Sequence, residues 1–132
     1  VYDGVKIFDG DLKEFELADV KILSEKVSLQ KGTVNNGGSN VYQLSVQNGA
    51  KVVVVAENTN NNNKEFFEFG VIDNGTDIFH TEYGNVRTGE QLIVPTFEKT
   101  ASGFARVNFD IGSSVTAGHN VVVTIVSNIN KK

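Results

Sequence analysis

Short runs rich in Val, Ile, Phe and Tyr recur throughout this chain, and Gly, Asn and Asp separate them. The run from Ala105 to Ile111 alternates apolar and polar side chains, which is the pattern of a strand buried on one face. Short strands at regular spacing are typical of sandwiches and barrels. We therefore expect an all-β fold: an antiparallel two-sheet sandwich, jelly-roll-like or Ig-like, with eight to ten strands.

The length and charge of the chain limit its organisation and its partners. Its 132 residues suit one hydrophobic core, so we expect a single β-sandwich domain over 1–132. No apolar run approaches the roughly 20 residues that a membrane helix needs, so we expect a soluble domain without a membrane partner. The net charge of -4 argues against nucleic acid as a partner, because phosphate binding requires clustered Lys and Arg.

The residues that usually carry chemistry are scarce. The chain has no cysteine, which excludes disulfides, thiolate metal sites and a cysteine nucleophile. Its two histidines, His80 and His119, are far apart in sequence, and neither belongs to a spacing typical of metal sites. No nucleophile elbow or comparable motif is present. We therefore predict that the chain is not an enzyme and that it needs no cofactor.

Calcium is the one cofactor that the sequence leaves open. Asp9, Asp11 and Glu14 could offer carboxylate oxygens to Ca²⁺, although the EF-hand pattern is absent. A turn followed by a capping acid explains the same residues without a metal, because Asp11 and Glu14 have the spacing of a helix capping box. We predict no metal site, with these three residues as the alternative. A helical turn over 12–18 likewise remains the alternative to a strand with a bulge at Ala18 and Asp19.

Two Asn-Gly pairs predict tight hairpins, because both residues tolerate the positive φ of a type I′ turn. A two-residue turn at Asn48-Gly49 would pair Gln47 with Ala50, and one at Asn74-Gly75 would pair Val71 with Ile78. The first hairpin would turn Tyr42, Leu44, Val53 and Val55 towards the core. From this register and the later strands, we expect six core residues: Leu44, Val53, Val55, Val107, Phe109 and Val123.

The second hairpin, over 66–83, has large apolar side chains on both faces. One face carries Phe67, Phe69, Val71 and Ile78, and the other carries Phe66, Ile72, Phe79 and Tyr83. A two-layer sandwich can bury only one of these sets. The second set is covered either by another part of the chain or by a partner, and exposed apolar patches often mark interaction sites. We predict an interface at Phe66, Ile72, Phe79 and Tyr83.

These features favour a non-catalytic structural or assembly protein. The most specific hypothesis is a virion accessory subunit, such as a phage capsid decoration protein or a head or tail protein, or else a subunit of an extracellular assembly. Its partner would be a second copy or a larger protein assembly, and its place would be the virion surface or the extracellular space.

The alternative is a carbohydrate-binding module with a β-sandwich fold, with carbohydrate as partner and with structural calcium. Tyr42, Phe79 and Tyr83 would then be the ligand-binding residues that stack on sugar rings. The absence of tryptophan counts against this alternative. A small hydrolase is a third hypothesis, because a fold does not determine a function.

Overall fold

The computed structural model describes residues 6–7, 14–16, 18–32, 41–100 and 105–130. The regular structure in these ranges is entirely β, and none of it is a helix that could span a membrane. The strands are β1 (Lys6–Ile7), β2 (Glu14–Glu16), β3 (Val20–Gln30), β4 (Val41–Gln47), β5 (Gly49–Asn58), β6 (Lys64–Asp73), β7 (Ile78–Arg87), β8 (Ile93–Lys99), β9 (Ala105–Ile111) and β10 (Asn120–Asn130).

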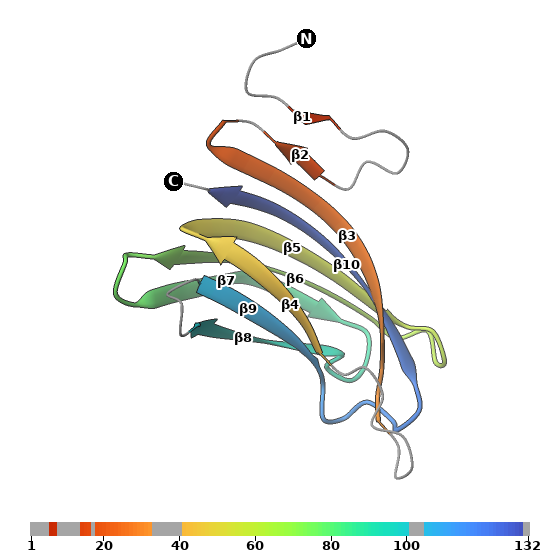
Figure 1. The fold of residues 1–132 in the computed structure, drawn as a ribbon. Helices are drawn as coiled ribbons and strands as arrows, with labels where there is room; N and C mark the ends of the chain where they lie inside the picture. The colour runs from red at the N-terminus through yellow and green to blue at the C-terminus, as the bar shows by residue number, and fades with distance from the viewer. Residues whose placement is uncertain (1–5, 8–13, 17, 33–40, 101–104, 131–132) are drawn as a thin grey trace.

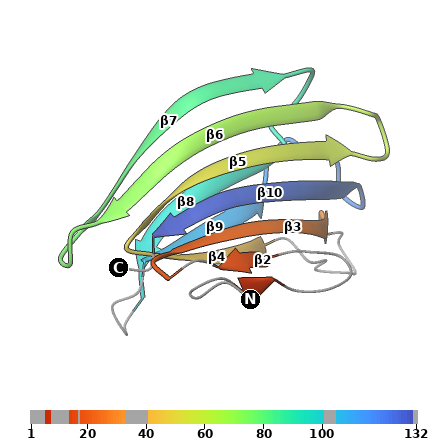
Figure 2. The same cartoon turned by 90° about the horizontal axis from the view of Figure 1, so that it is seen from above.

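The ten strands form two antiparallel sheets, which confirms the predicted sandwich class. The large sheet has the order β1-β2-β3-β10-β5-β6-β7, and the small sheet has the order β4-β9-β8. The large sheet curves over the small one (Figure 1), and β7 is its outermost strand on one side (Figure 2). Three strands therefore cover the inner face of a sheet of seven.

The core lies between the inner faces of the two sheets and follows the alternation of apolar residues. In β9, Ala105, Val107, Phe109 and Ile111 are all buried. Phe109 contacts Phe69 of the large sheet across the core, with ring centroids 6.1 Å apart. Of the six expected core residues, four are confirmed: Leu44, Val107, Phe109 and Val123.

The predicted hairpin at Asn48-Gly49 is wrong. β4 pairs with β9 in the small sheet, whereas β5 lies between β10 and β6 in the large sheet. The chain passes from one sheet to the other at Gln47, whose φ is 51°. The Asn48 amide donates to Asn130 O (3.2 Å), and Asn48 O accepts from the Asp73 amide (3.0 Å).

This corner also reverses the expected faces of β5. Val52 and Val54 are buried, whereas Val53 is half-buried and Val55 is exposed, so both of the latter were misplaced in the expected core. An Asn-Gly pair between two alternating runs fits a hairpin and a corner between sheets equally well. Long-range pairing of β5 with β10 decides between them, and no local propensity carries that information.

The hairpin at Asn74-Gly75 forms, but with a longer turn and another register. Residues 74–77 connect β6 to β7, with Asn74 N donating to Asp77 O (3.1 Å). Within this turn only Gly75 has a positive φ (94°), whereas a type I′ turn needs two such residues. Asp73 pairs with Ile78 and Val71 with His80, two positions from the predicted register. A shift of two residues leaves each side chain on its predicted face.

Near the start of the chain, Glu14–Glu16 form a strand, so the alternative of a helical turn there is wrong. The expected bulge at Ala18 and Asp19 is also wrong, because β2 and β3 pair antiparallel and the chain reverses direction between them, with a bend at these two residues. Asp9 and Asp11 lie outside the described residues, and so does the side chain of Glu14. The calcium alternative therefore stays a prediction.

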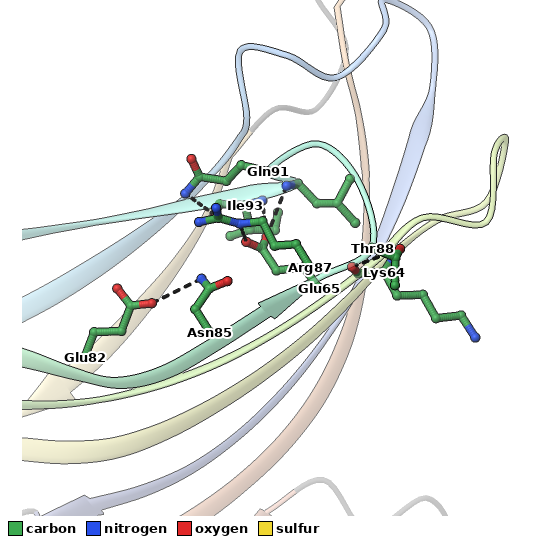
Figure 3. Close-up of polar contacts among 9 residues, drawn as sticks. Lys64, Glu65, Glu82, Asn85, Arg87, Thr88, Gln91 and Ile93 are labelled. Atoms are coloured by element: carbon green, nitrogen blue, oxygen red, sulfur yellow. Dashed lines mark hydrogen bonds and ion pairs between the residues drawn. The ribbon is translucent and has the colours of Figure 1, made fainter.

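A buried carboxylate fixes the connection between the two sheets at the end of β7 (Figure 3). Glu65 is 1% exposed, and its Oε2 accepts from Arg87 Nε at 2.6 Å. Its Oε1 accepts from the backbone amides of Leu92 and Ile93 at 3.1 and 3.0 Å. One carboxylate therefore holds the cross-strand neighbour on β7 and the chain that enters β8.

Replacing Glu65 with Ala should destabilise the protein by about 2–5 kcal/mol, since it leaves two buried amides without their acceptor, at about 1–3 kcal/mol each, and removes the partner of the exposed Arg87. Urea denaturation of the wild type and the variant measures the loss. Glu57→Ala is the matched control, because Glu57 makes an exposed ion pair with Lys64 at 3.5 Å, a type worth about 0–1 kcal/mol. Equal urea midpoints for Glu65→Ala and Glu57→Ala would contradict this account of the connection.

Candidate functional site

The outward side of β6 and β7 carries the largest exposed apolar side chains of the sandwich. Phe66 is 39% exposed, Ile72 59%, Phe79 50% and Tyr83 58%. The structure thus brings the four residues of the predicted interface together on one face. It adds Val86, which is 65% exposed and pairs with Phe66 across the two strands. We call these five residues the outer β6–β7 face.

β7 lies at the side of the large sheet, and every residue after Ile78 in this strand is exposed. On the inward side of β7, the His80 ring stacks on Phe97 of the small sheet. The two ring centroids are 3.8 Å apart and the interplanar angle is 11°. Tyr83 is the extra residue of a bulge, because Phe69 pairs with Glu82 while Glu68 pairs with Gly84. The bulge places Tyr83 over Gly70 on the outer side.

A hollow of about 620 Å³ crosses the outer side of the large sheet at this point. Two of its lining residues are glycines that other atoms approach closely: a Cβ at Gly70 would lie 2.7 Å from Tyr83 Oη, and one at Gly49 would lie 2.9 Å from Val71 O. Two rows of cross-strand partners border it, Asn130–Gly49–Ile72–Phe79 and Asn128–Lys51–Gly70–Thr81. The hollow therefore reaches from β10 to β7.

The polar groups around the hollow carry positive charge in a protein whose net charge is negative. Lys51 is the charged side chain among its described lining residues, and Lys51 Nζ lies 5.9 Å from the Tyr83 ring centroid. Asn128 and Asn130 add amide groups on the β10 side. Aromatic and aliphatic walls, amides and one ammonium suit a neutral or anionic ligand better than a cation.

Tyr42 does not belong to this surface. Its ring stacks on the buried Phe109 with centroids 6.3 Å apart, and its hydroxyl donates to Glu25 Oε2. Burial raises the pKa of the Tyr42 phenol, and the hydrogen bond to Glu25 raises it further. Of the three residues of the carbohydrate alternative, the structure therefore brings together only Phe79 and Tyr83.

A second polar cluster joins three loops, and the sequence analysis did not foresee it. Glu90 accepts hydrogen bonds from Asn58 (3.4 Å), Asn61 (3.1 Å) and Asn63. Asn58 is fully buried, and its amide nitrogen also lies 3.1 Å from His119 Nδ1. The described residues include no group of three His, Asp or Glu that could hold a metal ion. Spacing in sequence gave no signal for this cluster, because its loops are far apart along the chain.

The carboxylates with shifted pKa values are all held in the ionised form. Asn61 lowers the pKa of Glu90, Lys99 lowers that of Asp73 at 2.9 Å, and Asn108 and then Arg106 lower that of Glu98. Hydrogen bonds to the charged form are the main cause in each case. These groups are thus tuned away from general-acid chemistry, which needs a raised carboxyl pKa.

No protein-family model matches the chain, and no curated protein matches it. Among solved structures it is similar to part of the tailspike protein of Acinetobacter baumannii phage AM24, with a TM-score of 0.47 and 11% identity over 86% of this chain and 26% of that chain. The tailspike protein of Acinetobacter phage vB_ApiP_P1 gives a TM-score of 0.44 and 15% identity over 81% of this chain and 21% of that chain.

The tailspike protein of Acinetobacter baumannii bacteriophage Fri1, described as a capsular polysaccharide depolymerase, gives a TM-score of 0.39 and 17% identity over 96% of this chain and 20% of that chain. This chain therefore spans about a fifth to a quarter of the three tailspike proteins. At these TM-scores and identities the similarity concerns only the broad arrangement of strands.

The Glu90 cluster should make stability depend on pH. A carboxyl whose pKa is lower in the folded state stabilises the protein above its unfolded pKa, and the contribution is lost as the pH falls through the folded pKa. Glu90→Gln should therefore lower the free energy of unfolding more at pH 7 than at pH 3. Urea midpoints of both proteins at the two pH values measure this, and an equal difference at pH 7 and pH 3 would contradict it.

Proposed function

We propose that this chain is a non-catalytic assembly domain that associates with a second copy of itself through the outer β6–β7 face. The single observation that carries the proposal is the gathering of five exposed apolar residues on the outermost strand pair of a sheet. Aromatic residues on such a patch are typical anchors of protein interfaces. The lowered pKa values of Asp73, Glu90 and Glu98 come mainly from hydrogen bonds within the fold, which fits a structural role for these three carboxylates.

The setting that we propose for this assembly is the virion or another extracellular assembly, as the sequence analysis suggested. A capsid decoration protein or a head or tail accessory protein remains the finer form of this hypothesis. Mass spectrometry of purified particles from the encoding virus or organism would test it. Recovery of the chain only from the soluble fraction of cells would contradict this setting and leave the self-association untouched.

Phe79→Glu and Tyr83→Glu should each abolish self-association while the monomer stays folded, because they place a carboxylate at the centre of an apolar contact. Loss of one aromatic anchor costs about 2 kcal/mol or more, which is roughly a 30-fold weaker dimer. Light scattering at several concentrations measures the association, and circular dichroism checks the fold. Val126→Glu is the matched control, since Val126 is 43% exposed on the same side of the sheet but lies on β10.

Four results would overturn the proposal. A wild-type protein that stays monomeric at high concentration has no such interface. A dimer that survives both substitutions uses another surface, and a dimer that only Val126→Glu disrupts uses the middle of the sheet. Unfolding of the Phe79→Glu monomer would mean that the face is part of the internal core.

Carbohydrate binding is the second candidate function, and the hollow beside Tyr83 favours it. We propose that Phe79 and Tyr83 would contact sugar rings while Asn128 and Lys51 bind hydroxyl and carboxylate groups. Lys51→Ala should weaken binding of an oligosaccharide that contains uronic acid more than binding of a neutral one. NMR titration measures both affinities. Unchanged chemical shifts at Lys51 and Tyr83 with both sugars would rule this function out.

A further inference from the structure

The backbone of β7 has an unpaired side, and this side is open along the strand. β7 is the last strand of its sheet, and no other described strand pairs with it besides β6. In an antiparallel pair, every second residue directs its N–H and C=O groups to its neighbour, and the residues between direct theirs the other way. The alternation therefore tells which backbone groups of β7 lack a partner strand.

A hydrogen bond at the end of the hairpin shows which residues of β7 direct their backbone groups to β6. Asn74 N donates to Asp77 O at 3.1 Å, so the pairs Ile72–Phe79 and Gly70–Thr81 are the hydrogen-bonded ones. On the other side of β6, Asp73 N donates to Asn48 O, which directs the odd-numbered residues of β6 to β5 and agrees with this alternation. Ile78, His80 and Glu82 therefore direct their backbone groups to the open side.

The open side of β7 has features that protect a sheet edge only from Glu82 onward, where an inward charge is followed by the bulge at Tyr83. Natural edge strands are often short, or carry proline, lysine, an inward charge or a bulge. The single proline of the chain, Pro95, lies on β8, an outermost strand of the small sheet. β7 is ten residues long and contains neither proline nor lysine. Its bulge at Tyr83 limits regular pairing to the segment before it, 78–82.

We infer that this segment pairs with the same segment of a second copy, antiparallel, so that the two large sheets join into one across a twofold axis at His80. The inference rests on the proposed self-association and specifies its geometry. In this register His80 faces His80 of the copy, and Glu82 faces Ile78, so that the carboxylates do not face each other. Phe79 packs beside Thr81 of the copy on the outer side, and through this lateral contact the outer β6–β7 face takes part in the association.

The area of the outer face favours this geometry over contact between faces alone. A large aromatic side chain offers about 150–250 Å² in full, so the exposed parts of Phe66, Phe79 and Tyr83 give roughly 300 Å² per copy, and Ile72 and Val86 are smaller side chains. A standard interface buries about 800 Å² per partner. The apolar face alone falls short of that, and strand pairing adds both area and main-chain hydrogen bonds.

Amide hydrogen exchange of the full chain at low and high concentration tests the inference. On association, exchange at His80 and Glu82 should slow at least tenfold, whereas Phe79 and Thr81, already bonded to β6, should change much less. Fast exchange at His80 and Glu82 in a complete dimer would overturn strand pairing and leave the proposed self-association standing. A chain that never associates would overturn both.

A proline substitution gives a second test with a matched control. His80→Pro removes an outward N–H and the ring that stacks on Phe97, whereas His80→Ala removes only the ring. We expect His80→Pro to weaken the dimer at least tenfold more than His80→Ala, with both monomers folded by circular dichroism. Equal dimer affinities for the two variants would contradict the inference. If His80→Pro does not fold, the exchange pattern of the wild type decides alone.

Discussion

The carboxylate of Glu65 is the contact on which the relation between the two sheets depends. A buried charge is tolerated only when its oxygens are paired, and here one guanidinium and two backbone amides do so. Those donors belong to the end of β7 and to the chain entering β8. The large sheet therefore determines where β8 of the small sheet begins. No other described strand pairs with β7 on the side away from β6.

The sequence predicted what depends on alternation and missed what depends on distant pairing. Period-two patterns placed Val107 and Phe109 in the core and sorted the hairpin residues onto the correct faces, because a shift of two positions does not change a face. Asn48-Gly49 was mistaken for a hairpin, since the same local pattern also fits a corner between sheets. Val86 and Lys51 were missed because a bulge and a neighbouring strand, neither visible in spacing, bring them to the site.

The two sides of the large sheet have different physical tasks. Its inner side holds the buried aromatic and aliphatic residues that stabilise the sandwich, among them Phe67 and Phe69. Its outer side keeps Phe79 and Tyr83 in contact with solvent, an arrangement that costs free energy in water unless another molecule covers it. Self-association through the outer β6–β7 face and sugar binding in the hollow beside Tyr83 would each supply such a cover.

The position of β10 has a consequence for the order in which the fold can form. β10 is the last described strand, yet it lies between β3 and β5 (Figure 2). β5, β6 and β7 are neighbours in sequence and can pair early, whereas β3 has no place beside them until β10 arrives. During synthesis the first strands must therefore wait for the last, while the early β5–β6–β7 unit already presents its outer side to the cell.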